Sequence, residues 1–226
     1  MEFYLSDVLL IVSFAITIGA QIYISTTYSK YKDVKVGKGL SGSDVAREVL
    51  SKNGLSSIYV VETQGNLTDH YDPTKKVIRL SSDIYNGDSV SSYAVSLHEV
   101  GHALQYKEGY AFIKFRSFIY PVVNLSSKLS YIAIILGIIL GMLQLFYIGI
   151  ALFLILLLFQ LVTLPVEFDA SNRALKILEK DNYLNKDELA GARKVLKAAA
   201  LTYVASFTTS ILQIIRLLSI ANNRRR

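Results

Sequence analysis

The chain has 226 residues, of which 52% are hydrophobic, and a mean hydropathy of +0.37. It is too apolar for an ordinary soluble domain and too polar to consist only of membrane spans, so we expect one small polar domain attached to several spans. The formal charge of +6 comes from dispersed basic residues that cluster only beside apolar segments. That distribution is typical of anchoring at a membrane surface and argues against a nucleic-acid partner. Cysteine is absent, so a metal site would have to use His, Asp or Glu.

The first apolar segment predicts an N-terminal transmembrane helix within residues 1–29. No charge interrupts the 22 residues from Val8 to Ser29, and about 20 residues are enough to cross a hydrocarbon core. Glu2 and Asp7 precede this segment, whereas four lysines follow it, beginning at Lys30. The positive-inside rule therefore places the N-terminus outside and the following chain in the cytoplasm.

Residues 30–117 are predicted to form a small soluble α+β part. Ser43 and Asp44 could cap a helix that ends at Asn53 and Gly54. Three short β-prone runs follow, at Ser57–Thr63, Leu67–Tyr71 and Val77–Leu80. A turn sequence separates the last two runs, so we expect a small sheet that contains a hairpin.

The strongest helical pattern of this soluble part runs from Ser89 to about Lys107 and is closed by Gly109. It contains the sequence His98-Glu99-Val100-Gly101-His102, which has the form H-E-x-x-H. Residues four apart share a helix face, so both imidazoles could bind one Zn²⁺ ion, and the glutamate could take a proton from a metal-bound water. Gly101 would allow another element to approach closely. Two structural histidines and a surface glutamate are the alternative interpretation.

A longer apolar stretch, Leu129–Val166, contains 38 consecutive uncharged residues. A single helix of that length would reach nearly 60 Å, about twice the thickness of the core, so two spans joined by a tight turn fit better. We expect a transmembrane hairpin over residues 118–166, starting near Pro121 and turning near Gln144. A helix and linker over 167–197 should follow, and then an apolar helix over 198–226 that either spans the membrane or packs on the bundle.

Glu167 is the best candidate for the third metal ligand, because a two-span hairpin returns the chain to the membrane face that it left. We expect Glu167 near the start of a helix after Pro165, where a carboxylate could alternatively serve only the helix macrodipole. His70, on the predicted hairpin, could replace Glu167 as ligand, contact the substrate or stabilise the oxyanion. The alternative is an exposed histidine with no role in the site. Tyr71 could donate the same hydrogen bond to the reacting oxygen.

Four separated blocks resemble the YugP-type neutral zinc metallopeptidases of bacterial membranes, and they cover nearly the whole chain. The blocks are Asp69–Pro73, His98–Gln105, Leu164–Ser171 and Ala198–Val204. The chain is more distantly similar to HtpX-type membrane proteases, which have a downstream E-x-x-A-D ligand motif. Ser171 replaces the last Asp of that motif, and this Asp is expected to orient a zinc-binding His, so Asp169 or Asn172 is expected to take its role.

The residues and the resemblance together imply a mainly α integral-membrane zincin, with transmembrane helices and a small cytoplasmic α+β metalloprotease domain. We expect one Zn²⁺ per chain, held by His98, His102 and Glu167 in a gluzincin-like arrangement, with Glu99 as general base. The expected activity is hydrolysis of peptide bonds in polypeptides, including membrane-attached ones, at the cytoplasmic face of a bacterial plasma membrane. A zinc-binding scaffold without proteolysis and a zinc hydrolase of non-peptide substrates are the competing hypotheses.

Overall fold

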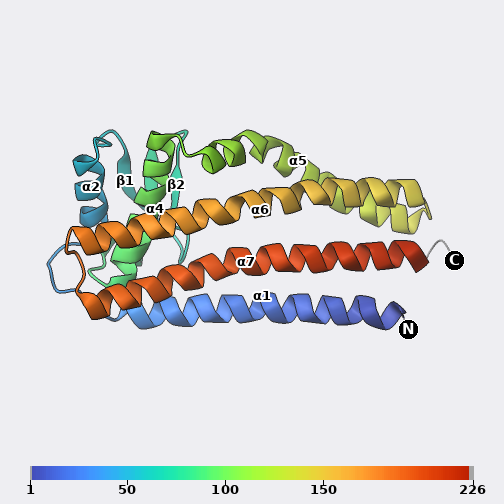
Figure 1. The fold of residues 1–226 in the computed structure, drawn as a ribbon, viewed down its shortest axis with the longest axis horizontal. Coiled ribbons are helices and arrows are strands. Elements are labelled where there is room, and N and C mark those ends of the chain that lie inside the picture. Colours follow the sequence, from blue (N-terminus) through green and yellow to red (C-terminus); the bar gives the residue numbers. More distant parts are fainter. Residues whose placement is uncertain (1, 224–226) are drawn as a thin grey trace. The chain divides into compact units, whose positions relative to one another are not determined.

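The computed structural model describes residues 2–223 (Figure 1), which divide into two compact units. The elements are α1 (Glu2–Lys32), α2 (Gly42–Lys52), β1 (Tyr59–Thr63), β2 (His70–Asp72), β3 (Val77–Ser81), α3 (Ser82–Asn86), α4 (Val90–Glu108), α5 (Ala111–Ile139), α6 (Leu143–Lys180) and α7 (Lys186–Asn223). Residues 2–21, 111–165 and 201–223 make up one unit, here called the apolar unit. Residues 22–110 and 166–200 make up the other, here called the HExxH unit.

Four helices of the described chain are long and apolar enough to cross a membrane. They comprise residues Ser6–Lys32, Ala111–Ile139, Leu143–Lys180 and Lys186–Asn222. Large apolar side chains remain exposed on them, such as Ile11 at 66%, Phe118 at 79% and Ile139 at 70%. Exposure of so much apolar surface to water would be energetically unfavourable. Such exposed apolar side chains are typical of helices that face lipid. The expected fold class, mainly helical and membrane-associated with a small sheet, is confirmed.

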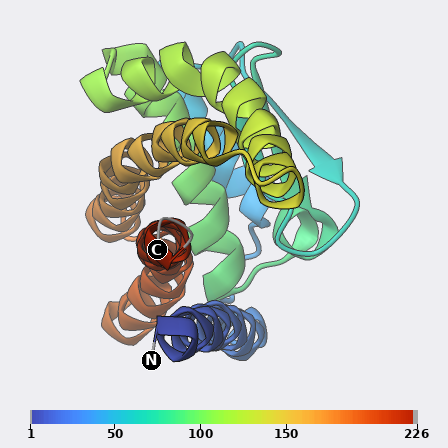
Figure 2. The ribbon, with the colours of Figure 1, turned by 90° about the vertical axis from the view of Figure 1, so that its right-hand side faces the viewer.

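Helices α5 and α6 follow one another as the expected helical hairpin, and both can be traced by colour in Figure 2, α5 in green to yellow-green and α6 in yellow to orange. The helices are separated by residues 140–142, where Gly141 has a φ of +66°. The turn therefore lies before Gln144, which belongs to α6, and α5 begins well before Pro121. Pro121 lies inside α5, and membrane helices tolerate such prolines because their surroundings satisfy the freed backbone groups.

Two glycines let the helices of this hairpin approach closely. A Cβ atom on Gly137 would lie 2.6 Å from the backbone nitrogen of Phe146, and one on Gly149 would lie 2.6 Å from Cγ1 of Ile134. The hydroxyl of Ser130 donates a hydrogen bond of 2.8 Å to the carbonyl oxygen of Gly149. Small residues and interhelical hydrogen bonds are the usual means of packing helices in lipid.

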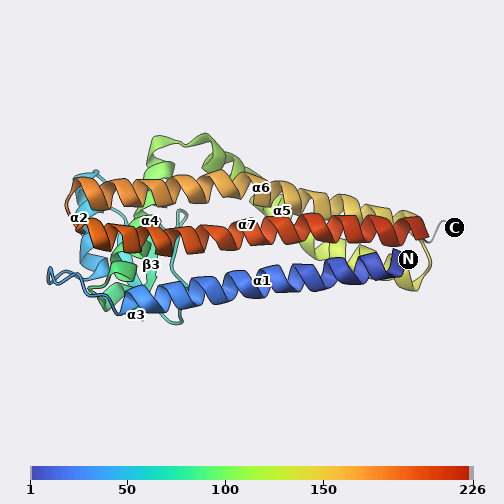
Figure 3. The same ribbon diagram turned by 60° about the horizontal axis from the view of Figure 1, so that its bottom comes forward.

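The two longest helices, α6 and α7, are each continuous over 38 residues (Figure 3). Pro165 lies inside α6, so the helix that we expected to begin near Glu167 does not begin there. The predicted capping box at the start of α7 is present. The Asn185 side chain accepts hydrogen bonds from the backbone of Asp187 and Glu188, and the Glu188 carboxylate accepts one from the Asn185 backbone.

The sheet of the HExxH unit has the strand order β1-β3-β2. Strand β3 pairs in parallel with β1, with Tyr59 opposite Val77, and antiparallel with β2, with His70 opposite Arg79. The predicted hairpin is therefore the β2–β3 pair. β2 is only three residues long and lies at one edge of the sheet.

Helix α4 passes through the core of the HExxH unit. Ser89 caps its start by accepting a hydrogen bond from the Ser92 backbone, and Gly109 ends it in the left-handed conformation with a φ of 69°. Most of its residues are buried, and a helix buried on all sides is expected at the centre of a domain. Before it, α2 is capped by Ser41 and not by Ser43, which lies inside that helix.

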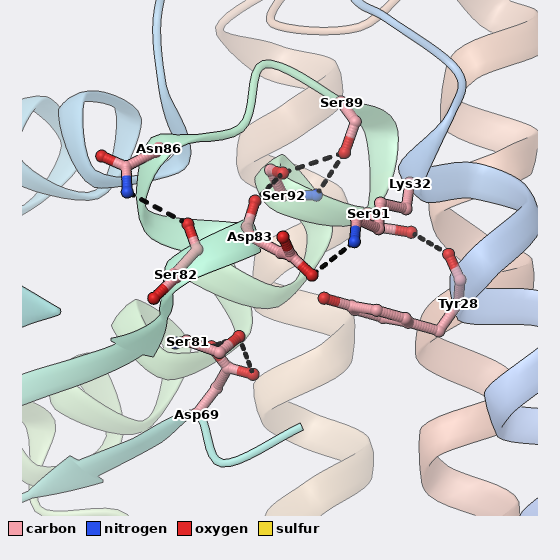
Figure 4. A network of polar contacts seen from close by, with 10 residues as sticks. All are labelled: Tyr28, Lys32, Asp69, Ser81, Ser82, Asp83, Asn86, Ser89, Ser91 and Ser92. Carbon is pink, nitrogen blue, oxygen red and sulfur yellow. Dashed lines mark hydrogen bonds and ion pairs between the residues drawn. The ribbon is translucent and has the colours of Figure 1, made fainter. Parts of the chain in front are cut away.

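A polar network fastens the end of α1 and the loop before β2 to this core (Figure 4). The hydroxyl of Ser91 donates to the carbonyl oxygen of Tyr28 over 3.0 Å, and Lys32 forms an ion pair with Asp83. The backbone N–H of Ser81 donates to the carboxylate of Asp69 over 2.7 Å. The edge strand β2 is therefore tied to β3 by a side chain as well as by its backbone.

Candidate metal centre

The two histidines of the H-E-x-x-H sequence lie one turn apart on α4. Their ring centroids are 4.7 Å apart and the ring planes are nearly perpendicular, at 81°. Both side chains are largely buried, with exposed fractions of 13% for His98 and 11% for His102. The spacing of four residues places them on one helix face, as the sequence predicts.

Helix α6 crosses α4 at Gly101. A Cβ atom at this position would lie 2.7 Å from the carbonyl oxygen of Ala170, closer than real Cβ contacts allow. Only glycine permits this approach without displacement, so the expected role of Gly101 is confirmed. Glu167 precedes Ala170 by three residues on α6 and so shares its helix face. The crossing therefore brings the Glu167 carboxylate to the two imidazoles.

One carboxylate oxygen of Glu167 faces the Nε2 atoms of both histidines. Its Oε2 lies 3.3 Å from Nε2 of His98 and 3.6 Å from Nε2 of His102, and the Glu167 side chain is only 3% exposed. Ligand atoms arranged tetrahedrally about zinc at its usual bond lengths lie about 3.3 Å apart. The three side chains therefore fit a single zinc ion. Since α6 continues through Pro165, the alternative role at a helix N-terminus is excluded for Glu167.

A glutamine one turn further along α4 holds the ring of His102. Nδ1 of His102 lies 3.0 Å from Oε1 of Gln105, whose amide nitrogen donates to the Val166 carbonyl oxygen over 2.8 Å and to the Asp169 carboxylate over 2.9 Å. With Nδ1 donating its proton to Gln105, the lone pair of Nε2 is directed at the metal position. Such partners fix the tautomer and the orientation of a ligating imidazole.

The ring of His98 is held by Ser171. Its Oγ lies 3.2 Å from Nδ1 of His98. Ser171, which replaces the last Asp of the E-x-x-A-D pattern, is therefore itself the partner of the His98 imidazole. Neither Asp169 nor Asn172 takes that role for His98. Asp169 acts on the other imidazole, through Gln105, and is held in turn by Arg173 over 2.6 Å.

Glu99 is buried beside the two histidines, with 6% of its surface exposed. Its burial raises the pKa of the carboxyl group, and the nearby His98 and His102 act in the opposite direction. A carboxyl group with a raised pKa holds a proton more readily near neutral pH than an exposed glutamate does. This property suits a group that takes up a proton and later releases it.

The two strand residues proposed for catalysis have different surroundings. His70 is exposed on β2, its Nδ1 lies 2.8 Å from the carbonyl oxygen of Thr68, and the metal-binding group found among the described residues contains Glu167 and not His70. Tyr71 packs edge-on against Tyr106 of α4, with ring centroids 5.6 Å apart. Of the two residues, Tyr71 is the one in contact with the helix that carries the histidines.

Sequence reasoning missed the parts played by Gln105 and Ser171. Gln105 follows His102 by three residues, which is a helix-neighbour spacing and could have indicated the contact. Nothing local identifies Ser171 as a partner of His98, because the two residues are separated by 73 positions and meet only through the helix crossing.

Four membrane-length helices, a three-stranded sheet and a buried cluster of two histidines and one glutamate define a membrane metalloprotein with a single-ion site. Residues 6–222 match the family model described as "Putative neutral zinc metallopeptidase", and the chain belongs to this family. It is 42% identical over 217 residues, or 96% of either chain, to the protein named "Putative membrane protease YugP" of Bacillus subtilis (strain 168). No solved structure matches the chain. The predicted resemblance is confirmed, and zinc is the metal of this family.

Proposed function

We propose that the protein is a zinc-dependent endopeptidase of the zincin type whose active site faces the cytoplasm at the membrane surface. The metal ligands are His98, His102 and Glu167, and the general base is Glu99. The convergence of both Nε2 atoms on one oxygen of Glu167 carries this proposal. A purely structural pair of helix histidines would need neither this buried carboxylate nor a separate partner for each Nδ1 atom.

Zinc, when bound, supplies a water molecule with a pKa near 7 and polarises the carbonyl group of the substrate. Glu99 takes the proton from that water and delivers it to the nitrogen of the departing amine. Ser171 and Gln105 keep the two imidazoles in the required tautomer throughout. Burial of Glu99 and Glu167 keeps bulk water away from both carboxylates, which strengthens electrostatic interactions within the site.

The edge strand β2 is the proposed docking site for an extended polypeptide. Adjacent residues of a strand point to opposite faces, so Tyr71 faces α4 while His70 faces away from it. We assign Tyr71 the hydrogen bond to the developing oxyanion and His70 a contact with the bound polypeptide. The backbone of β2 would hold the substrate by adding a strand to the sheet.

The cytoplasmic orientation follows from the number of spans and the distribution of charge. The two segments of the HExxH unit, residues 22–110 and 166–200, include the ends of the candidate spans and connect the first span to the second and the third to the fourth. When all four helices cross, both segments lie on the same side of the membrane. The segment after α1 contains Lys35 and Lys38, whereas the turn at residues 140–142 contains no charge. By the positive-inside rule, the HExxH unit is cytoplasmic.

The decisive experiment compares Glu99→Gln with the matched control Glu62→Gln, which removes an exposed carboxylate from β1. Zinc content is measured by elemental analysis, and cleavage by mass spectrometry of unfolded and membrane-tethered polypeptides. We expect one zinc per chain in both variants, and a loss of about 10²–10⁴-fold in kcat/KM for Glu99→Gln alone. Unchanged cleavage by Glu99→Gln would remove this residue from the mechanism.

The same experiment separates the two competing functions. A scaffold would bind one zinc per chain and leave every polypeptide intact. A hydrolase of non-peptide substrates would also leave polypeptides intact, but it would release products from lipids or small amides in a manner that depends on Glu99.

A further inference from the structure

A basic pocket lies between the parts of α6 and α7 that belong to the HExxH unit. It encloses about 370 Å³. Lys176 on α6 and Arg193 and Lys197 on α7 supply three positive charges, and Glu179 supplies the single negative charge of its wall. Apolar side chains such as Phe168 and Leu196 complete the lining, so the pocket combines cationic side chains with an apolar surface.

The three cations of the pocket are unpaired within the described part of the chain. In the part of the chain that the structure describes, Lys176, Arg193 and Lys197 take part in no ion pair. Arg173, one turn before Lys176, is by contrast paired with both Asp169 and Glu108. Formally the pocket therefore retains a net charge of +2, from three cations and one anion.

The pocket lies next to the membrane-length segments in sequence. Lys197 is the last charged residue before the uncharged stretch that begins at Ala198, and Phe168 follows Val166, the last residue of the preceding stretch. Leu201 is the first residue of α7 that belongs to the apolar unit. At 1.5 Å per residue, Lys197 is about 6 Å along α7 from Leu201. The polar headgroup layer of a bilayer is roughly 5–8 Å thick on each side. Lys197, which lines the pocket, is therefore expected at headgroup depth.

We propose that this pocket binds the phosphodiester headgroup of an anionic phospholipid. Arg193 and Lys197 lie four residues apart on one face of α7, so both can reach a single phosphate, which Lys176 approaches from α6. The lipid chains would continue over the apolar wall at Phe168 and Leu196. Basic pockets between membrane helices are suited to such headgroups, and the attraction is worth about 1 kcal/mol for each basic residue near the surface.

The pocket is distinct from the proposed metal centre and does not depend on peptide hydrolysis. Ser171 is the one residue that lines the pocket and also holds a metal ligand, through Nδ1 of His98. No metal ligand lines the pocket. Lipid binding and proteolysis can therefore be measured, and can fail, independently.

The experiment uses the full chain in nanodiscs of equal parts phosphatidylcholine and phosphatidylglycerol, with retained lipids counted by native mass spectrometry. The pocket variant is Arg193→Gln/Lys197→Gln. The control is Lys180→Gln/Lys186→Gln, which removes two exposed charges from the same two helices outside the pocket. We expect the wild type and the control to retain phosphatidylglycerol in preference to phosphatidylcholine. The pocket variant should lose about tenfold of that preference.

Three results would overturn the proposal. Equal retention by the wild type and the pocket variant would show that the pocket holds no headgroup, and equal losses in both double variants would show only general surface attraction. Displacement of the lipid by millimolar inorganic phosphate, or by an acidic peptide, would assign the pocket to those ligands instead. Unchanged zinc content and thermal unfolding of the pocket variant establish that it is folded.

Discussion

The hydroxyl of Ser171 lies 3.2 Å from Nδ1 of His98 and thereby fixes the ring whose other nitrogen faces Glu167. A serine hydroxyl is neutral, whereas the aspartate expected at this position would carry a full negative charge. The Ser171 hydroxyl therefore orients the His98 imidazole without making that imidazole much more basic. The arrangement predicts a metal affinity that depends on this hydrogen bond but is not set by a buried charge.

The first prediction concerns this hydrogen bond. Ser171→Ala should lower zinc affinity by about 10-fold, because removing an imidazole partner from a metal site typically costs 10–100-fold. Affinity is measured by competition with a chelator, using the exposed Ser56→Ala as the control. Ser171→Asp should restore tight binding. Equal affinities for the wild type and Ser171→Ala would mean that the contact does not orient His98.

The second prediction tests the helix crossing. Gly101→Ala places a Cβ atom 2.7 Å from the Ala170 carbonyl oxygen, so α6 must move away from α4. We expect the free energy of unfolding to fall by about 1–3 kcal/mol, together with loss of bound zinc, since Glu167 moves with α6. Thermal unfolding and zinc content are measured. The control is Gly19→Ala in α1, where a Cβ atom meets nothing within 4 Å. Retention of full zinc content by Gly101→Ala would contradict the crossing.

The third prediction concerns pH and two carboxyl groups of opposite behaviour. Burial raises the pKa of Asp69 above its ordinary 3.8, so Asp69 binds protons more tightly when the protein is folded. Its contribution to stability is therefore present at low pH and is lost as pH rises from about 4 through the folded pKa. Asp69→Asn can still accept the Ser81 hydrogen bond, and it should gain in unfolding temperature relative to the wild type between pH 4 and 7.

Asp72 provides the matched comparison. Hydrogen bonds from Thr74 and Lys75 lower the pKa of Asp72 to about 2, so its stabilising effect is present at neutral pH and is lost as pH falls from about 4 toward 2. Asp72→Asn should therefore lose unfolding temperature relative to the wild type at pH 7, and the difference should shrink in acid. If the unfolding temperatures of Asp69→Asn and Asp72→Asn changed in the same direction near neutral pH, the pKa shift assigned to one of the two carboxyl groups would be wrong.

The fourth prediction tests membrane orientation. Because the chain has no cysteine, a single introduced cysteine is the only thiol available for labelling. Lys75→Cys, in the turn before β3, should react with a membrane-impermeant maleimide only after cells are opened. Met142→Cys, in the turn between α5 and α6, should react in intact cells. The opposite pattern would place the HExxH unit outside the cytoplasm.

Local sequence patterns were enough to predict α4, its caps and the face shared by His98 and His102. These features depend on residues three or four apart and on a glycine just past the helix end. The hairpin of α5 and α6 was also predictable, because an uncharged stretch of that length cannot be one span. The pairing of β2 with β3 followed from the turn sequence between them.

The course of α6 through Pro165 could not be predicted in the same way. In water a proline normally interrupts a helix, so the sequence predicted that a helix would start just after Pro165. Where water cannot hydrate the freed carbonyl group, continuing the helix is the better solution. The partners of the imidazoles depend on the approach of α6 to α4 at Gly101. That approach is a property of packing and not of sequence spacing.

The continuity of α6 has a mechanical consequence. One continuous helix begins at Leu143, directly after the hairpin turn, contains Glu167 beside the imidazoles and ends at Lys180. Successive residues are offset by about 100° around a helix. Rotation of α6 about its axis by that amount would turn the Glu167 carboxylate away from the imidazoles of His98 and His102. The rotation of α6 about its own axis therefore decides whether the Glu167 carboxylate reaches the two imidazoles.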